Sequence, residues 1–100
     1  MNRTLIALAL ITTTSTASAL DCNQFATLAE HVMRSHQSGV PLTSVMSNFE
    51  ENVSSAAARK VLKKMAVLAY EQPRYSTDKF QRKAIAEFRD DFATACYARH

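Results

Sequence analysis

The sequence predicts an all-α protein, a compact bundle of about four helices in which a disulfide joins the first helix to the last. Three observations support this prediction: one glycine and two prolines in 100 residues, apolar residues that recur at steps of three and four, and two cysteines far apart in the chain. Because β-sandwiches and flexible linkers need frequent turn residues, the first observation excludes them. The length suffices for one small domain and not for two.

Residues 1–19 have the pattern of a secretory signal peptide. Arg3 supplies a positive charge, an apolar run covers residues 5–11, and small residues lead up to Ala19. The apolar run is shorter than the roughly 20 residues that a membrane span requires. We therefore expect export to the periplasm or beyond, cleavage after Ala19, and a single helical domain over residues 20–100 with no transmembrane segment.

Both cysteines, Cys22 and Cys96, lie in the expected mature chain, and disulfides persist outside the cytosol. One intramolecular bridge would close a loop of about 75 residues and stabilise the fold by at most about 4.5 kcal/mol. Redox pairs are usually Cys-x-x-Cys, and a zinc site would need two further ligands at matching spacing. We therefore predict a structural disulfide that sets the first and last helices side by side and antiparallel.

The first helix is expected over residues 21–38, followed by a corner. Gly39 is the only glycine and occupies the position after the helix, where a left-handed conformation is often needed. Pro41 lacks an amide hydrogen and cannot continue the helix. The apolar stripe of this helix consists of Cys22, Phe25, Ala29, Val32 and Met33.

A short second helix is expected to carry Val45, Met46 and Phe49, with Thr43 or Ser44 as its cap. The polar residues 52–55 then interrupt the pattern and supply caps for a third helix, which runs to about Glu71. The apolar stripe predicted for the third helix is Ala58, Val61, Leu62, Met65, Leu68 and Ala69.

The fourth helix follows a loop at residues 72–75 and opens at Ser76 or Thr77, with Asp78 favourably placed near its N-terminal dipole. Short connections between four helices favour an antiparallel bundle or a compact orthogonal variant of one. This helix has the strongest apolar stripe of the chain: Phe80, Ala84, Ile85, Phe88, Phe92, Ala95 and Cys96.

No residue pattern in the chain indicates catalysis, a metal site or a cofactor. The histidines lack the i, i+4 spacing of a helical metal site, and His36 is expected at the boundary of the core while His31 falls on the polar side. Adjacent carboxylates on a helix point about 100° apart and cannot readily share a proton. We therefore expect a protein that is not an enzyme; an enzyme with an unrecognised site stays a remote alternative.

Two basic groups and one loop are candidate partner-binding surfaces. Arginine and tyrosine are common anchors of protein interfaces, and clustered lysines attract acidic partners or, weakly, anionic lipid head groups and peptidoglycan. The alternatives are a solvated face for the basic residues and a cover over the end of the core for the tyrosines. The candidates are Arg59, Lys60, Lys63 and Lys64 on the third helix, Tyr70, Arg74 and Tyr75 at the loop, and Lys79, Arg82 and Lys83 beyond it.

The formal net charge of +3 falls by one when Arg3 is removed with the signal peptide. Such a weak, balanced charge does not predict a nucleic-acid partner.

From Cys22 to Cys96 the chain resembles a group of small secreted proteins found in bacterial and prophage genomes. The resemblance implies a helical fold with a cysteine near each end and indicates no activity. It rests on Val32-Met33, Gln37-Ser38-Gly39-Val40-Pro41-Leu42, Ala69-Tyr70-Glu71-Gln72-Pro73-Arg74-Tyr75, Ile85 and Glu87-Phe88-Arg89.

These observations favour a non-catalytic periplasmic interaction protein that binds an envelope protein or a toxin through the basic third helix and the loop at Pro73. A second hypothesis is an envelope-stress or chaperone-like protein that exposes apolar surface when it loosens, by analogy with small periplasmic acid-stress chaperones.

Overall fold

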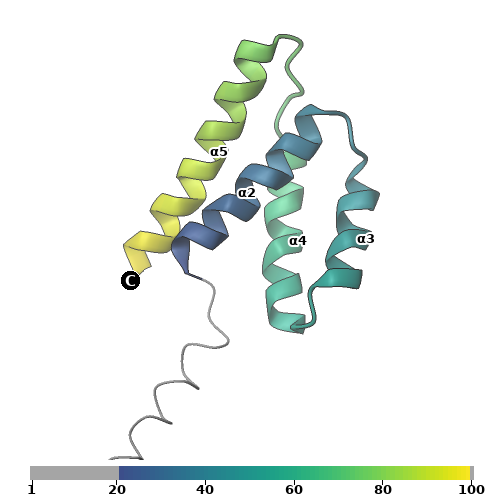
Figure 1. Cartoon of the computed structure of the whole chain (residues 1–100), viewed down its shortest axis with the longest axis vertical. Helices are drawn as coiled ribbons and strands as arrows, with labels where there is room; N and C mark the ends of the chain where they lie inside the picture. Colours follow the sequence, from purple (N-terminus) through teal and green to yellow (C-terminus); the bar gives the residue numbers. More distant parts are fainter. Residues whose placement is uncertain (1–20, 100) are drawn as a thin grey trace, which may run out of the picture.

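Four helices form the part of the chain that the computed structural model describes, residues 21–99. The predicted signal peptide lies outside the described residues, as do Leu20 and His100. The helices are drawn in Figure 1 and comprise α2 (Cys22–Gln37), α3 (Leu42–Asn52), α4 (Ala56–Tyr70) and α5 (Asp78–Arg99).

Both ends of α2 follow from local sequence. Asp21 is the N-cap, and a capping box forms because its carboxylate accepts a 2.7 Å hydrogen bond from the Gln24 amide while the Gln24 side chain accepts one from the Asp21 amide. At the other end Gly39 has φ +88°, the left-handed conformation predicted for the only glycine. The expected corner at Pro41 is therefore confirmed.

The start of α3 differs from the prediction. Pro41 is its N-cap and the helix begins at Leu42, before the expected capping residues Thr43 and Ser44. The Pro41 carbonyl accepts a 3.0 Å hydrogen bond from the Ser44 amide, so the helix begins without a side-chain cap. A proline has no amide hydrogen to leave unpaired at this position, which makes the earlier start possible.

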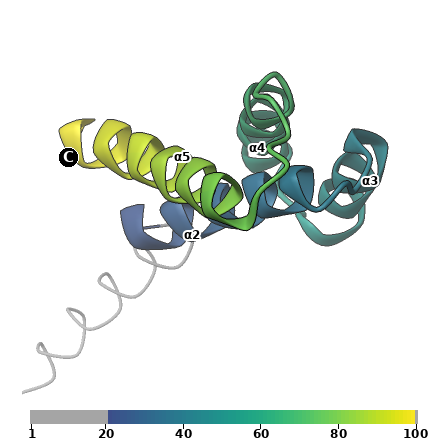
Figure 2. The same cartoon turned by 90° about the horizontal axis from the view of Figure 1, so that it is seen from above.

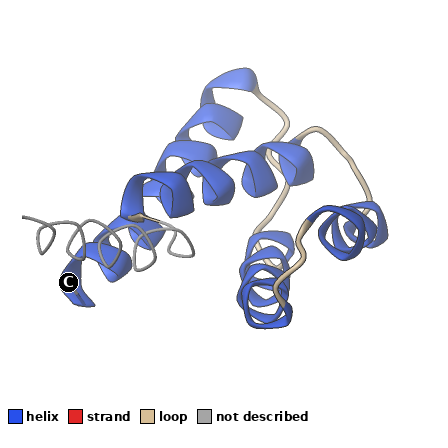
Figure 3. Ribbon diagram, turned by 60° about the horizontal axis from the view of Figure 1, so that its bottom comes forward, coloured by secondary structure: helices blue, strands red, loops and turns tan. Residues whose placement is uncertain are grey.

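The caps of α4 and α5 come from the residues that the sequence indicated. The Ser55 hydroxyl accepts a hydrogen bond from the Ala58 amide at 3.2 Å. The Thr77 hydroxyl accepts one from the Phe80 amide at 3.3 Å, and Asp78 lies in the first turn of α5. Figure 3 shows the two loops that these caps close, and no strand occurs within residues 21–99.

Helix α2 organises the bundle. It packs along α5 and also against α4, while α3 packs mainly against the other side of α4 (Figures 1 and 2). The Cys22–Cys96 disulfide joins the start of α2 to the end of α5, with 5.5 Å between the two Cα atoms. The all-α fold, the disulfide and the neighbouring first and last helices are therefore confirmed.

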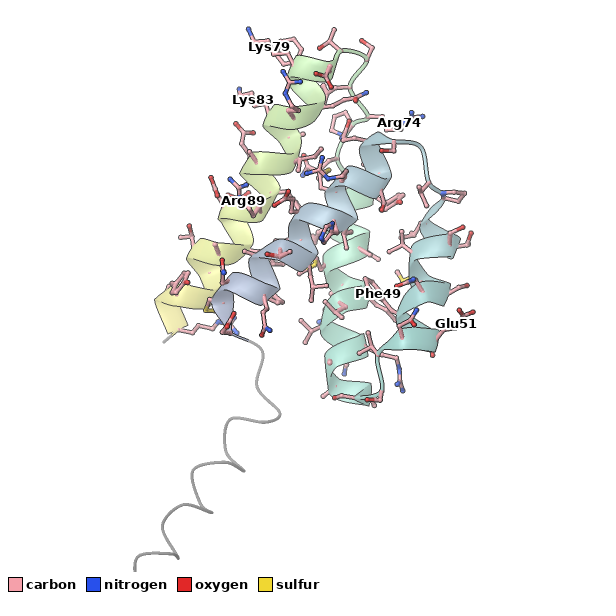
Figure 4. The ribbon with its side chains drawn as sticks, in the orientation of Figure 1. Phe49, Glu51, Arg74, Lys79, Lys83 and Arg89 are labelled. Carbon is pink, nitrogen blue, oxygen red and sulfur yellow. A yellow bond between two sulfur atoms is a disulfide. The ribbon has the colours of Figure 1, made fainter. Side chains whose placement is uncertain are left out.

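The core lies on the faces of the helices that meet α2. Its most deeply buried large side chains are Met33 and Met65, from α2 and α4. Phe49 points from α3 toward α4 (Figure 4). The rest of the buried apolar cluster is Ala29, Val32, Val45, Leu62, Ala66, Ala69, Ile85 and Phe88.

Four residues assigned to the core by periodicity are exposed, among them Ala95 near the end of α5. Val61 and Leu68 on α4 and Phe80 on α5 each remain 49% exposed. The physical reason is that α4 and α5 have no extensive contact with each other, so the apolar edges that they turn toward one another stay uncovered.

A polar clamp at the end of α2 holds the loop between α4 and α5. Gln37, 2% exposed, donates from Nε2 to the Pro73 carbonyl at 2.8 Å and accepts from the Tyr75 amide at 2.8 Å. His36 Nε2 lies 2.6 Å from the Gln72 carbonyl, and its ring packs 4.3 Å from the Tyr70 ring. These bonds pair backbone groups of the loop that lie partly buried against the end of α2.

Removing the disulfide should lower the free energy of unfolding by about 2–4 kcal/mol, because the long closed loop restricts the unfolded chain. Urea unfolding followed by circular dichroism compares the oxidised protein, the reduced protein and the Cys22→Ala/Cys96→Ala variant. The reduced protein keeps its side chains and controls for lost packing. Equal midpoints for the oxidised and reduced proteins would contradict the prediction.

Replacing Gln37 by Met should cost about 1–3 kcal/mol of stability, because it leaves the Tyr75 amide and the Pro73 carbonyl without their partners. Gln72→Met is the matched control, since the Gln72 side chain is exposed in the same region. Urea unfolding measures both variants. Equal, small losses in the two would show that the clamp is not stabilising.

Candidate functional site

A groove follows α5 and faces α4 along one half, which is mainly apolar, and the loop after α4 along the other, which is mixed; Phe25 and Met33 of α2 lie at its base, and we call it the α4–α5 groove. Its walls rise from α4, with the loop that follows it, and from α5, because these two helices both pack on α2 but diverge from one another (Figure 2). One half encloses about 360 Å³ and is lined by Phe25, Val61, Lys64, Met65, Leu68, Phe92, Ala95, Cys96 and Arg99. The other half encloses about 280 Å³ and is lined by Met33, Gln72, Tyr75, Phe80, Lys83, Ala84, Glu87, Phe88 and Asp91.

Aromatic rings fix the floor of the groove. Phe92 packs edge-on against Phe25 at 5.5 Å and tilts against Phe88 at 4.8 Å between ring centroids. The disulfide lies directly beside them, because Cys96 lines the same half. The apolar base of the groove is therefore held by α2 and α5 together.

Two of the four predicted basic residues on α4 stand beside this groove with exposed side chains. Lys64 lines it, and Lys60 lies one turn earlier on α4. A shallow depression on the outer face of α4 adjoins the groove and shares Lys64 and Leu68 with it. Val67, also in this depression, is 41% exposed. Exposed apolar side chains and lysines thus alternate over one surface of α4.

The other two basic residues of the cluster are engaged by α3. Lys63 forms an ion pair with Glu50, and Arg59 lies 3.7 Å from the same carboxylate. Arg59 also donates to the carbonyls of Val53 and Ser54, at 2.8 and 3.1 Å, and so braces the connection between α3 and α4. The pKa of Glu50 is lowered from 4.5, first by the hydrogen bond from Lys63 and then by the charge of Lys63.

The predicted loop surface is also partly structural. The Tyr70 hydroxyl donates to the Val40 carbonyl at 2.6 Å, and burial raises the pKa of Tyr70 above 10.0. Tyr70 packs against the core, which agrees with the alternative that this tyrosine covers the end of the core. Arg74 donates to the Gln37 carbonyl at 3.4 Å and its guanidinium lies over Gly39.

Tyr75 is the loop residue that reaches the candidate site. It is 37% exposed, lines the end of the groove near Phe80, and its ring lies 6.2 Å from the Phe80 ring. Tyr75 of the loop and Lys64 of α4 therefore lie at opposite ends of the same groove.

The basic groups do not form one continuous patch. Lys60 is near the start of α4, whereas Arg74 follows its other end, roughly 15 Å away along the helix by the rise per residue. Figure 4 places Arg74, Lys79 and Lys83 at the end of the bundle that carries the loop between α4 and α5. Of these, Lys83 reaches the groove.

Within residues 21–99, no group of three or more His, Cys, Asp and Glu side chains is arranged to hold a metal ion. Over the same residues, no helix is both long and apolar enough to cross a membrane. His31 is exposed, as the sequence indicated, whereas His36, expected at the boundary of the core, is buried at the end of α2.

No family model, curated protein or solved structure matches the chain.

The groove is the feature that sequence reasoning missed. Val61 and Leu68 were assigned to the core because they fall on an apolar stripe, and no signal in the stripe distinguishes a covered edge from an open one. The sequence feature that comes closest to marking the groove is the spacing of Lys64 and Leu68. They lie one helical turn apart, so a lysine stands beside an apolar residue that is expected in the core.

Acid should weaken the ion pair between α3 and α4. The folded-state pKa of Glu50 lies below 4.5, so the stability from this pair is fully present above that pH and is lost as the pH falls through the lowered pKa. Glu50→Gln should therefore reduce the acid-induced loss of stability, by a small amount because the pair is exposed. Urea midpoints between about pH 6 and pH 3 test this.

Glu51→Gln provides the matched control, because Glu51 points away from α4 in Figure 4. If Glu50→Gln and Glu51→Gln both lose stability in acid to the same extent as the parent protein, the ion pair between Glu50 and Lys63 does not contribute to the acid dependence, and the prediction is wrong.

Proposed function

We propose that the protein is an exported, non-catalytic interaction module that binds another protein of the cell envelope, or a toxin, through the α4–α5 groove and the lysines beside it. The disulfide is compatible with a periplasmic or extracellular location, where such bonds persist. The sequence pattern of residues 1–19 supports export by a cleaved signal peptide. The resemblance to secreted prophage-encoded proteins supports a phage origin.

The observation that carries the proposal is the exposure of Val61 and Leu68 beside Lys64. A domain of this size has little apolar surface to spare, and leaving two large aliphatic side chains about half exposed in one groove forgoes stabilisation that their burial would give. Contiguous exposed apolar residues rimmed by charge are typical of protein interaction sites. The proposed binding surface is therefore smaller than the basic cluster predicted from the sequence. It includes Lys60 and Lys64 beside the groove and leaves out Arg59 and Lys63.

The charged residues divide accordingly. Lys60 and Lys64 have exposed side chains at the proposed surface, whereas Arg59 and Lys63 stabilise the packing of α3 on α4 through Glu50. Tyr75 contributes at the opposite end of the groove, and Arg74 holds the end of α2.

Site-specific photocrosslinking in intact cells tests this function. A photoreactive residue at Leu68 should give a discrete crosslinked product, because that position lines the groove. The same residue at Tyr97 is the control, since Tyr97 lies on α5, is 63% exposed and is not among the residues that line the groove. The product should disappear in the Lys60→Glu/Lys64→Glu background and persist with Lys79→Glu.

Two results would contradict the proposal. One is the absence of any crosslinked product from the photoreactive residue at Leu68, although the proteins that carry this residue at Leu68 and at Tyr97 both fold and are exported. The other is a product that forms equally from Leu68 and Tyr97, which would indicate random collisions.

A further inference from the structure

The shape of the α4–α5 groove selects a rod-like occupant. In the half that contains Val61 and Leu68, residues of α4 line one side, residues of α5 line the other, and Phe25 of α2 lies between them. The wall formed by α4 and the loop after it runs from Val61 through Leu68 to Gln72, and its helical part, which ends at Tyr70, is roughly 14 Å long at the rise of an α-helix. That length matches about three turns of a helix laid along the groove.

The charges of the groove are unequal at its two ends. The half that contains Val61 and Leu68 has Lys64 and Arg99 in its lining and no acidic residue. Lys60 continues the positive charge into the adjoining depression, whose lining also lacks an acid, whereas Lys63 in the same depression is paired with Glu50. The other half mixes Lys83 with Glu87 and Asp91. An occupant therefore gains most by placing carboxylates beside Lys64.

We propose that the groove binds an acidic amphipathic helix of another protein, about three turns long, in a helix-in-groove mode. This inference rests on the proposed function and names the chemistry of the partner. The apolar stripe of the partner helix covers Val61, Leu68 and Phe92, and carboxylates at one end of that helix pair with Lys60 and Lys64.

A second copy of this chain fits the groove less well. Within residues 21–99 the apolar stripes of its helices mostly face the core or the groove, and the exposed apolar residues on the outer face of α4 stand among lysines, which would repel the lysines beside the groove. If two copies placed their grooves face to face, the rims would meet first, and the apolar residues at the base of each groove would not touch.

Three synthetic peptides test the chemistry directly. Each has about 14 residues and the same leucine stripe at helical spacing, and its remaining positions near one end carry Glu, Gln or Lys. Fluorescence anisotropy with the oxidised full-length protein measures their affinity. The Glu peptide should bind, and the Lys peptide should bind at least about tenfold more weakly.

Matched variants locate the binding. Leu68→Glu should abolish it, and Lys60→Glu/Lys64→Glu should reverse the preference toward the Lys peptide. Tyr97→Glu makes the same charge change as Leu68→Glu, and Lys79→Glu reverses one lysine charge. Both lie outside the groove lining and should leave the affinity for the Glu peptide unchanged. Circular dichroism establishes that each variant is folded.

Several outcomes would overturn the inference. Equal affinity for all three peptides would indicate charge-independent capture of apolar segments, as in a chaperone. A dimer that Leu68→Glu converts to monomer would show that a second copy fills the groove. Binding to vesicles of anionic phospholipid that is lost with Leu68→Glu would identify a membrane instead.

No binding of the Glu peptide would also overturn it, and the crosslinking experiment then separates the two proposals. A product from Leu68 without peptide binding would leave the interaction function standing and reject the acidic helix as its ligand.

Discussion

Helix α2 is tied to the rest of the fold at both of its ends, and this double attachment governs the structure. At its start the Cys22–Cys96 disulfide holds it to the end of α5, and at its end the Gln37 amide holds the backbone of residues 73–75. Between these two points α2 packs against both α4 and α5. Since both helices are fixed to α2, they cannot close on each other without giving up those contacts. The groove between them is thus a consequence of how the bundle is held, and the folded protein presents it without having to loosen.

The same attachment decides which basic residues are available to a partner. Because α3 packs on the side of α4 away from α5, Glu50 meets Arg59 and Lys63, whereas Lys60 and Lys64 keep exposed side chains at the surface that includes the groove rim. One helix thus has a paired basic edge with a structural role and an exposed basic edge. In the sequence the four basic residues of this helix look equivalent. The position of α3 divides them into two pairs: Arg59 and Lys63 contact Glu50, and Lys60 and Lys64 have exposed side chains.

Features set by local sequence could be predicted, and features set by the relative placement of helices could not. Gly39, Ser55 and Thr77 act within a few residues of their own positions, so the corner and the caps of α4 and α5 followed from residue type, whereas the cap expected for α3 at Thr43 or Ser44 was wrong. The disulfide followed because only two cysteines exist. Val61 and Leu68 lie on an apolar stripe, but periodicity defines a face and not the neighbour that covers it. The clamp made by Gln37 joins residues that are 36 and 38 positions apart, and no local signal marks such a contact.

Solvent accessibility of individual methyl groups in the oxidised protein tests the open groove most directly. Methyl NMR with a soluble paramagnetic agent compares Val61 and Leu68 with Leu62, a core residue of the same helix that is 3% exposed. The structure predicts strong broadening of the Val61 and Leu68 methyl signals and protection of Leu62. Equal protection of all three would show that α4 and α5 close on each other in solution, and would contradict both the groove and the role of α2 in holding it open.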